Sequence, residues 1–222
     1  MGKCIRSLAR GATLLGAIAL LAASAHAAAP SDRKQVHTSF REFARAVAAR
    51  DGAGGAALLS KASFAEWQRA REAAFTGERE TVAALAPGRR LLVFALRHHR
   101  PPFLQRTGTP RELGVHAIES GLADGDSLAR VELADVVVRG DRAVGSLIVA
   151  GLPSSFRAGF VREDGVWKLD LPMTLDSASR VITHAAEASG GTEDSVIAGL
   201  IYASSGVRPT TRIWVPMGEP AG

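Results

Sequence analysis

The sequence predicts an α+β fold, in which N-terminal helices pack on an antiparallel sheet and a helical extension follows the sheet. Two stretches of strand-like alternation, each divided by a Gly/Asp turn, lie between residues 128 and 171. Apolar residues at spacings of three and four, which are typical of amphipathic helices, occur before and after them. We therefore expect one α+β domain over residues 28–172, with a helical extension over residues 173–222 packed on it.

The second strand pair has the clearer register. Asp164-Gly165 favours a type I′ turn, which pairs Arg162 with Trp167 and Phe160 with Leu169. Because side chains alternate across a strand, one face of this hairpin is apolar and belongs in the core. Arg162 is expected to lie over the Trp167 ring as a cation–π contact. The apolar face comprises Phe156, Ala158, Phe160, Trp167, Leu169 and Leu171.

The first strand pair, which turns at Gly140-Asp141, is apolar on both faces. Its predicted register pairs Val137 with Val144 and Asp135 with Ser146, and both faces should be covered. Asp135 would then lie on an apolar surface, where desolvation favours the protonated form of a carboxyl group. That makes Asp135 a candidate general base. A longer turn, or a slip of one residue, would exchange the two faces and expose it.

Helices account for the chain before the sheet. The spacing of apolar residues predicts helices over residues 32–50, 63–77, 78–85, 89–99 and 110–120. Ser63 with Glu66, and Thr109 with Glu112, have the spacing of capping boxes. Arginines from Arg69 to Arg90 alternate with glutamates, which predicts a solvated surface of mixed charge. His98 and His99 close one helix, where positive charge is favourable, and His116 lies on the next.

The segment after Leu171 predicts two further helices, over residues 174–188 and 192–206. Pro172 is expected to end the last strand, and Trp214 to dock back on the domain. The apolar stripe of these helices needs a partner, and it would cover the second face of the first hairpin. The alternative cover is a homodimer that pairs sheet with sheet.

Residues 1–27 have the pattern of a secretory signal peptide. Three basic residues precede an apolar run from Gly11 to Ala23, and Ala25-His26-Ala27 gives a small-x-small cleavage site. We therefore expect an exported protein, periplasmic or secreted, with no transmembrane segment after cleavage. The single cysteine, Cys4, lies within the leader, so the mature chain would hold no disulfide and no thiolate ligand.

The charge balance gives little support for an anionic partner. The chain has 27 Lys and Arg against 22 Asp and Glu, a net charge of +5. Three of those bases lie in residues 1–27, so the mature chain has a net charge of +2. This excess is too small to indicate binding to nucleic acid.

The last hairpin resembles that of the nuclear transport factor 2-like superfamily. In that family it often reads aromatic-x-Arg-Glu-x-Gly-x-Trp-Lys-hydrophobe-Asp-Leu, and the Leu58-Leu59-Ser60 turn after a helix is also similar. The resemblance covers residues 33–172 and implies a cone, with helices packed into a curved antiparallel sheet. The matching residues are Phe160, Arg162, Glu163, Gly165, Trp167, Lys168, Leu169, Asp170 and Leu171.

Enzymes of that superfamily, such as ketosteroid isomerase and scytalone dehydratase, place carboxylates, tyrosines or histidines inside the cone. None of those positions can be transferred to this chain. The remaining catalytic candidates are Asp135 with one of His98, His99 or His116. No pair of histidines has the spacing of a zinc site, and no cofactor motif is present, so we expect neither metal nor cofactor.

Two functions are therefore compatible with the sequence. The preferred one is an exported, non-catalytic protein that binds a small apolar ligand or a protein partner. The alternative is a small cofactor-free enzyme of the isomerase, dehydratase or cyclase kind, which uses Asp135 and a histidine in the cone. The fold alone cannot decide between them, because one fold hosts many activities.

Export is directly testable. When the protein is expressed in a bacterium with its own leader, the mature chain should be recovered outside the cytoplasm and begin near Ala28. Mass spectrometry of the purified protein measures this. An intact Met1 on a cytoplasmic product would refute the expectation.

Overall fold

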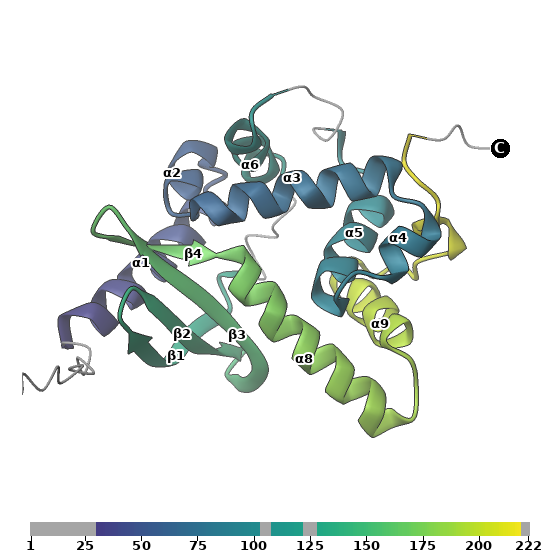
Figure 1. Cartoon of the computed structure of the whole chain (residues 1–222). Coiled ribbons are helices and arrows are strands. Elements are labelled where there is room, and N and C mark those ends of the chain that lie inside the picture. Colours follow the sequence, from purple (N-terminus) through teal and green to yellow (C-terminus); the bar gives the residue numbers. More distant parts are fainter. Residues whose placement is uncertain (1–29, 103–107, 122–127, 219–222) are drawn as a thin grey trace, which may run out of the picture.

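The computed structural model of the protein describes residues 30–102, 108–121 and 128–218 (Figure 1). Within these residues the α+β class is confirmed, since helices precede and follow a four-stranded antiparallel sheet. The helices before the sheet are α1 (Pro30–Ala48), α2 (Gly52–Ala57), α3 (Lys61–Thr76), α4 (Arg79–Ala83), α5 (Pro87–His99) and α6 (Pro110–Glu119). The strands are β1 (Val131–Arg139), β2 (Arg142–Val149), β3 (Leu152–Glu163) and β4 (Val166–Asp170). After them come α8 (Leu171–Ser189), α9 (Glu193–Ser205) and the 3₁₀ turn η2 (Thr211–Trp214).

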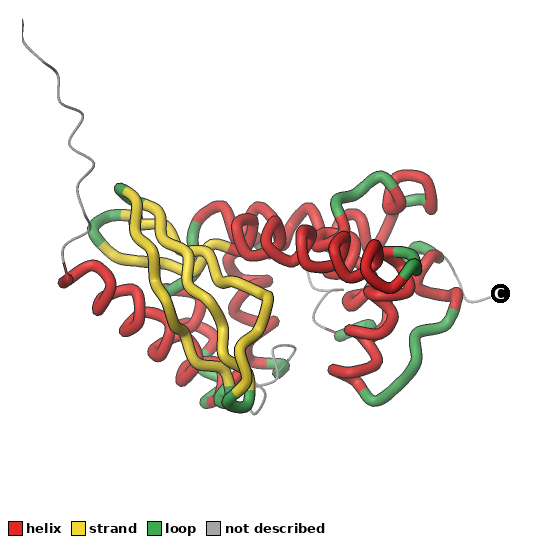
Figure 2. The backbone as a smooth tube through the Cα atoms, turned by 90° about the horizontal axis from the view of Figure 1, so that it is seen from below, coloured by secondary structure: helices red, strands yellow, loops and turns green. Residues whose placement is uncertain are grey.

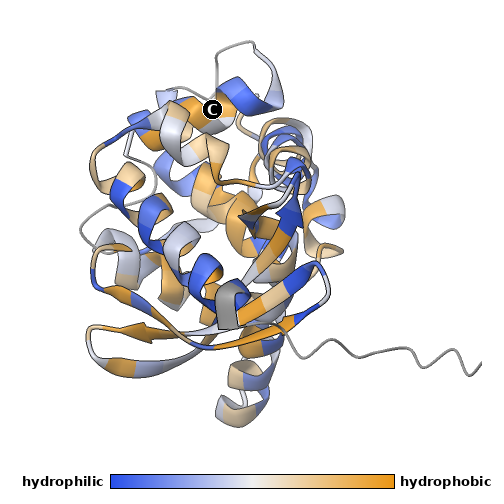
Figure 3. Cartoon of the chain, turned by 90° about the vertical axis from the view of Figure 1, so that its left-hand side faces the viewer, coloured by the Kyte–Doolittle hydropathy of each residue, from blue (hydrophilic) through white to orange (hydrophobic). Residues whose placement is uncertain are grey.

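The sheet is a meander in the order β1-β2-β3-β4. The register predicted for the second hairpin is confirmed, because Arg162 pairs with Trp167 and Phe160 with Leu169. Both turn residues, Asp164 and Gly165, have positive φ, as a type I′ turn requires. Figure 3 shows the resulting alternation of apolar and polar residues along the strands.

The register predicted for the first hairpin is correct only next to the turn. Val137 pairs with Val144, but Ser146 pairs with Ala134 instead of Asp135. The cause is a β-bulge between Ala134 and Val137, in which Asp135 has a φ of 45°. A bulge adds one residue to one strand, so every pair beyond it shifts by one and Asp135 becomes exposed.

Helix α1 covers one face of the sheet (Figure 2). Val36 and Phe40 of α1 pack there, and the rings of Phe40 and Phe160 meet edge to face with centroids 6.4 Å apart. Trp167, at 1% exposure, is the largest fully buried side chain of the described residues. The strand residues of this core are Leu133, Val136, Val138, Ala143, Ala158, Phe160 and Trp167.

A second core lies among the helices at the other end of the molecule. Phe94 of α5 is fully buried there, together with Ile182 of α8 and Ile197 of α9. The prediction that Trp214 docks back is confirmed, since its ring lies 4.6 Å from that of Phe94, with Arg79 stacked over it. Helices α3 and α8 therefore run from the sheet to this helical core (Figure 1).

Buried arginines hold the helical core together. The guanidinium of Arg97 donates to the carbonyl oxygens of Ala73, Ala74 and Gly77 at the end of α3, and to that of Ile213. The carbonyl groups of the last helical turn lack partners within their own helix, and Arg97 supplies them. Burial lowers the pKa of this guanidinium, against the opposing charge of Glu78.

The solvated mixed-charge surface predicted between Arg69 and Arg90 is wrong in part. Glu66 is only 2% exposed and lies between Arg69 and Arg89, at 2.7 and 3.0 Å. Burial lowers the pKa of Arg89, but its hydrogen bond to Asp176 and the charges of Asp176 and Glu66 outweigh this, so the net shift is upward. The alternation of charges along the sequence carried no information on which of them pair or on how deeply they are buried.

The sheet and the helices meet at a buried polar junction. Ser60 Oγ donates to Asp170 Oδ2 at 2.9 Å and accepts the backbone N–H of Ser63. Ser63 Oγ in turn donates to the carbonyl oxygen of Leu169. Leu59 forms a parallel bridge with Leu169, so the segment before α3 is paired with the end of β4. Ser60 and Ser63 are fully buried and Asp170 nearly so.

This junction corrects two predicted boundaries. Ser60, not Ser63, is the N-cap of α3, because its side chain accepts the N–H at the third position of the helix. Pro172 was expected to end the last strand, but it lies in the first turn of α8. No intrahelical hydrogen bond is lost there, because the first N–H groups of a helix have no partner within it. Asp170 caps that helix through the N–H of Met173, so α8 begins at Leu171.

The C-terminal helices cover the sheet less than predicted. Helix α8 packs along β3, but α9 contributes Ile197 and Ile201 to the helical core. Val137, on the face of the sheet opposite α1, remains 52% exposed. The expectation that both faces of the first hairpin are covered is therefore wrong for this residue. In the described part of the chain, no helix has the length and apolar character needed to cross a membrane.

The burial of Trp167 gives a stability prediction. Trp167→Ala should lower the free energy of unfolding by about 3–5 kcal/mol, because it leaves a large cavity in the sheet core. Val166→Ala, at a neighbouring position that is 48% exposed, should change it by no more than about 0.5 kcal/mol. Urea unfolding of the two variants measures the difference. Equal losses would show that the indole does not anchor the core.

The polar junction gives another. Ser60→Ala leaves a buried carboxylate oxygen without its donor and removes the cap of α3, so we expect a loss of about 1–3 kcal/mol. The matched control is Ser189→Ala, since that exposed hydroxyl bonds only to carbonyl groups of its own helix. Chemical denaturation that gives the same midpoint for both variants would contradict a stabilising role for the junction.

Candidate functional site

The structure does not support the predicted catalytic role of Asp135. Its side chain is exposed at the bulge of β1 and does not face Ser146 across an apolar surface. The reason is the extra residue at the bulge, which reverses the face on which the preceding residues lie. The environment that would have made this carboxyl group a general base is therefore missing.

The three candidate histidines lie among the helices and do not approach Asp135. His98 Nε2 is 3.2 Å from Ser205 Oγ, and His116 Nδ1 is 3.0 Å from a carboxylate oxygen of Glu119. The rings of His98 and His99 meet edge to face, with centroids 5.1 Å apart. Partial desolvation, together with the charge of His98, lowers the pKa of His99. The structure thus assigns these histidines contacts within the helical part.

Metal ligands are not brought together either. Among residues 30–102, 108–121 and 128–218, no three His, Cys, Asp or Glu side chains form a group that could hold a metal ion.

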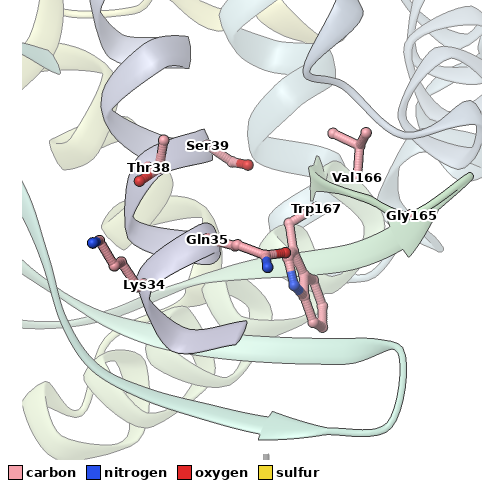
Figure 4. A pocket seen from close by; sticks show the side chains of 7 residues that line it. All are labelled: Lys34, Gln35, Thr38, Ser39, Gly165, Val166 and Trp167. Carbon is pink, nitrogen blue, oxygen red and sulfur yellow. The ribbon is translucent and has the colours of Figure 1, made fainter. Parts of the chain in front are cut away.

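A groove of about 380 Å³ lies between α1 and the β3–β4 hairpin. Trp167 and Val166 provide its apolar wall on the strand side, and α1 supplies polar and basic side chains on the other (Figure 4). The side chain of Gln35 points toward the Trp167 indole. The lining residues are Lys34, Gln35, Thr38, Ser39, Gly165, Val166 and Trp167.

Trp167 is in contact with a charged pair at this groove. The guanidinium of Arg162 lies over its ring at 4.7 Å, which confirms the predicted cation–π contact. Arg162 also forms a 2.8 Å ion pair with Asp32 of α1, so the helix, the arginine and the indole are tied together. This pair fixes α1 against the hairpin and so maintains the groove.

The indole nitrogen of Trp167 is the unusual atom of the site. Nε1 is buried and has no hydrogen-bond partner. Leaving a buried donor unpaired costs about 1–3 kcal/mol, and such groups in native proteins call for an explanation. A buried donor beside a groove can bind an acceptor atom of a ligand that reaches it.

Sequence reasoning missed this groove although it placed Trp167 in the core. The alternation of the last hairpin shows that Trp167 faces inward, but it does not show where α1 crosses the strands. The groove depends on that crossing, which the spacing of apolar residues does not give. The run of polar residues at positions 34, 35 and 38, on a helix whose other face contacts the sheet, is the signal that could have revealed the groove.

The chain was compared with protein-family models, with curated proteins and with solved structures, and nothing matched. The function of the site must therefore be inferred from its own geometry.

Proposed function

We propose that this protein is an exported, non-catalytic binding protein, and that the groove between α1 and β4 takes a small apolar ligand. The observation that carries the proposal is the buried, unpartnered Nε1 of Trp167 at that groove. A volume of about 380 Å³ lies within the range of small-molecule sites. The ligand we infer has an apolar body, which lies against Trp167 and Val166, and one acceptor atom for the indole.

A fold of the nuclear transport factor 2-like kind is part of the same proposal. Helix α1 packs on one face of an antiparallel meander, and the Leu58–Ser60 segment pairs with β4. In a cone of this kind the ligand lies between helix and sheet, which is where the groove is found. The resemblance to that superfamily rests on the motif of the last hairpin.

The other functions considered from the sequence find less support. The enzyme alternative depended on Asp135 facing a histidine, and these residues lie on different parts of the molecule. A protein partner is less well supported, because the groove that Trp167 and Val166 line has the volume of a small-molecule site. The small ligand is therefore the function that the geometry supports best.

Binding of a neutral apolar dye, Nile red, tests the proposal in the mature chain. Wild-type protein should bind the dye with increased fluorescence. Thr38→Trp and Val166→Trp, which fill the groove from its two walls, should each weaken binding by at least about tenfold, or 1.4 kcal/mol.

The control is Arg33→Trp, which places the same side chain at an exposed position on the opposite side of α1. Its dye affinity should stay within about twofold of wild type, or 0.4 kcal/mol. Circular dichroism establishes that all variants are folded. No binding to the wild type, or equal binding to the filled variants, would refute the groove as the site.

A further inference from the structure

A second groove, of about 420 Å³, lies between the edge of β3 and helix α8. It exists because β3 is much longer than β4, whose pairing with β3 ends at Gly159. Beyond that point the edge of β3 faces α8 in place of a strand. The lining residues are Ser155, Arg157, Ser177, Arg180, Val181, His184 and Ala185.

Hydroxyl groups of α8 satisfy this edge. The backbone N–H of Gly159 donates to Thr174 Oγ1 at 3.1 Å, and that of Arg157 donates to Ser177 Oγ at 3.2 Å. The hydroxyl of Thr174 in turn donates a hydrogen bond to the backbone carbonyl oxygen of Asp170. Ser177 donates no hydrogen bond within the described residues, although it is only 5% exposed. One wall of the groove thus carries a buried hydroxyl with an unused proton.

The charge of the groove has one sign. Arg157 and Arg180 are exposed, His184 lies one turn beyond Arg180, and no carboxylate lines the groove. In the described part of the chain, neither arginine forms an ion pair, whereas Arg89, Arg90 and Arg162 all do. Two guanidinium groups at one concave surface without a carboxylate are suited to an oxyanion, which each can bind through two parallel hydrogen bonds.

We propose that this groove binds the phosphate group of a small organic phosphate ester. A carboxylate needs only one guanidinium, whereas a phosphate monoester carries nearly two charges and three acceptor oxygens at neutral pH. Two arginines and the Ser177 hydroxyl match that demand. The groove is larger than a phosphate ion, and Val181 and Ala185 offer apolar contact to the organic part. This inference is independent of the groove at Trp167.

Isothermal titration calorimetry of the mature chain with adenosine 5′-monophosphate tests the proposal, with inorganic phosphate and adenosine as further probes. We expect the nucleotide to bind more tightly than phosphate, and adenosine not to bind. Arg157→Gln and Arg180→Gln should each weaken nucleotide binding by at least about tenfold. Higher salt should weaken it further, since the attraction between exposed charges is screened.

Arg33→Gln is the matched control, because it removes the same charge from an exposed site on α1 and should leave nucleotide affinity within about twofold. Thr38→Trp should leave it unchanged as well, which separates this groove from the one at Trp167. Absence of nucleotide binding, or equal binding by Arg180→Gln, would overturn the site. Equal affinity for inorganic phosphate would overturn the assignment of an organic ester.

Discussion

The hydrogen bond from Ser60 to Asp170 is the contact on which the arrangement of the two halves depends. Ser60 caps α3 and Asp170 caps α8, so both long helices begin at one buried point. Each side chain caps its own helix and is also hydrogen-bonded to the other residue. Because the helices leave the sheet from this point and end in the helical core, their common origin sets the position of that core relative to the strands.

Buried arginines connect the helices around the aliphatic helical core. Arg97 collects carbonyl groups from two elements, and Arg90 joins α5 to the start of α9 through Glu193 and Asp194. Its rigid fork satisfies several acceptors in one fixed geometry, which lysine cannot do. These paired arginines therefore serve the internal architecture, whereas Arg157 and Arg180, which form no ion pair in the described part of the chain, are available for binding.

Features that depend on neighbouring residues could be predicted from the sequence, whereas features that depend on packing between separate elements could not. A Gly-Asp or Asp-Gly turn is local, so the pairing of Phe160 with Leu169 and of Arg162 with Trp167 could be derived from a few residues. The bulge at Asp135 inserts one residue where no Gly or Pro marks it, and period-two reasoning fails beyond such a point. The groove at Trp167 lies between elements far apart in the chain, and the second groove depends on how α8 packs along β3, so neither lining follows from local patterns. Trp167 was placed in the core correctly, but its unpaired nitrogen becomes visible only in three dimensions.

The bulge that displaced Asp135 from its expected position has a meaning for the sheet as a whole. Strand β1 lies at an edge, and its run of three valines would otherwise offer a flat template to another chain. A bulge with an exposed carboxylate twists and charges such an edge, which hinders strand-to-strand aggregation. At the opposite side, the hydroxyls of α8 occupy amide groups of β3 that a foreign strand could otherwise bind. Asp135 thus gives the edge strand two of the features by which natural sheets discourage the addition of a foreign strand.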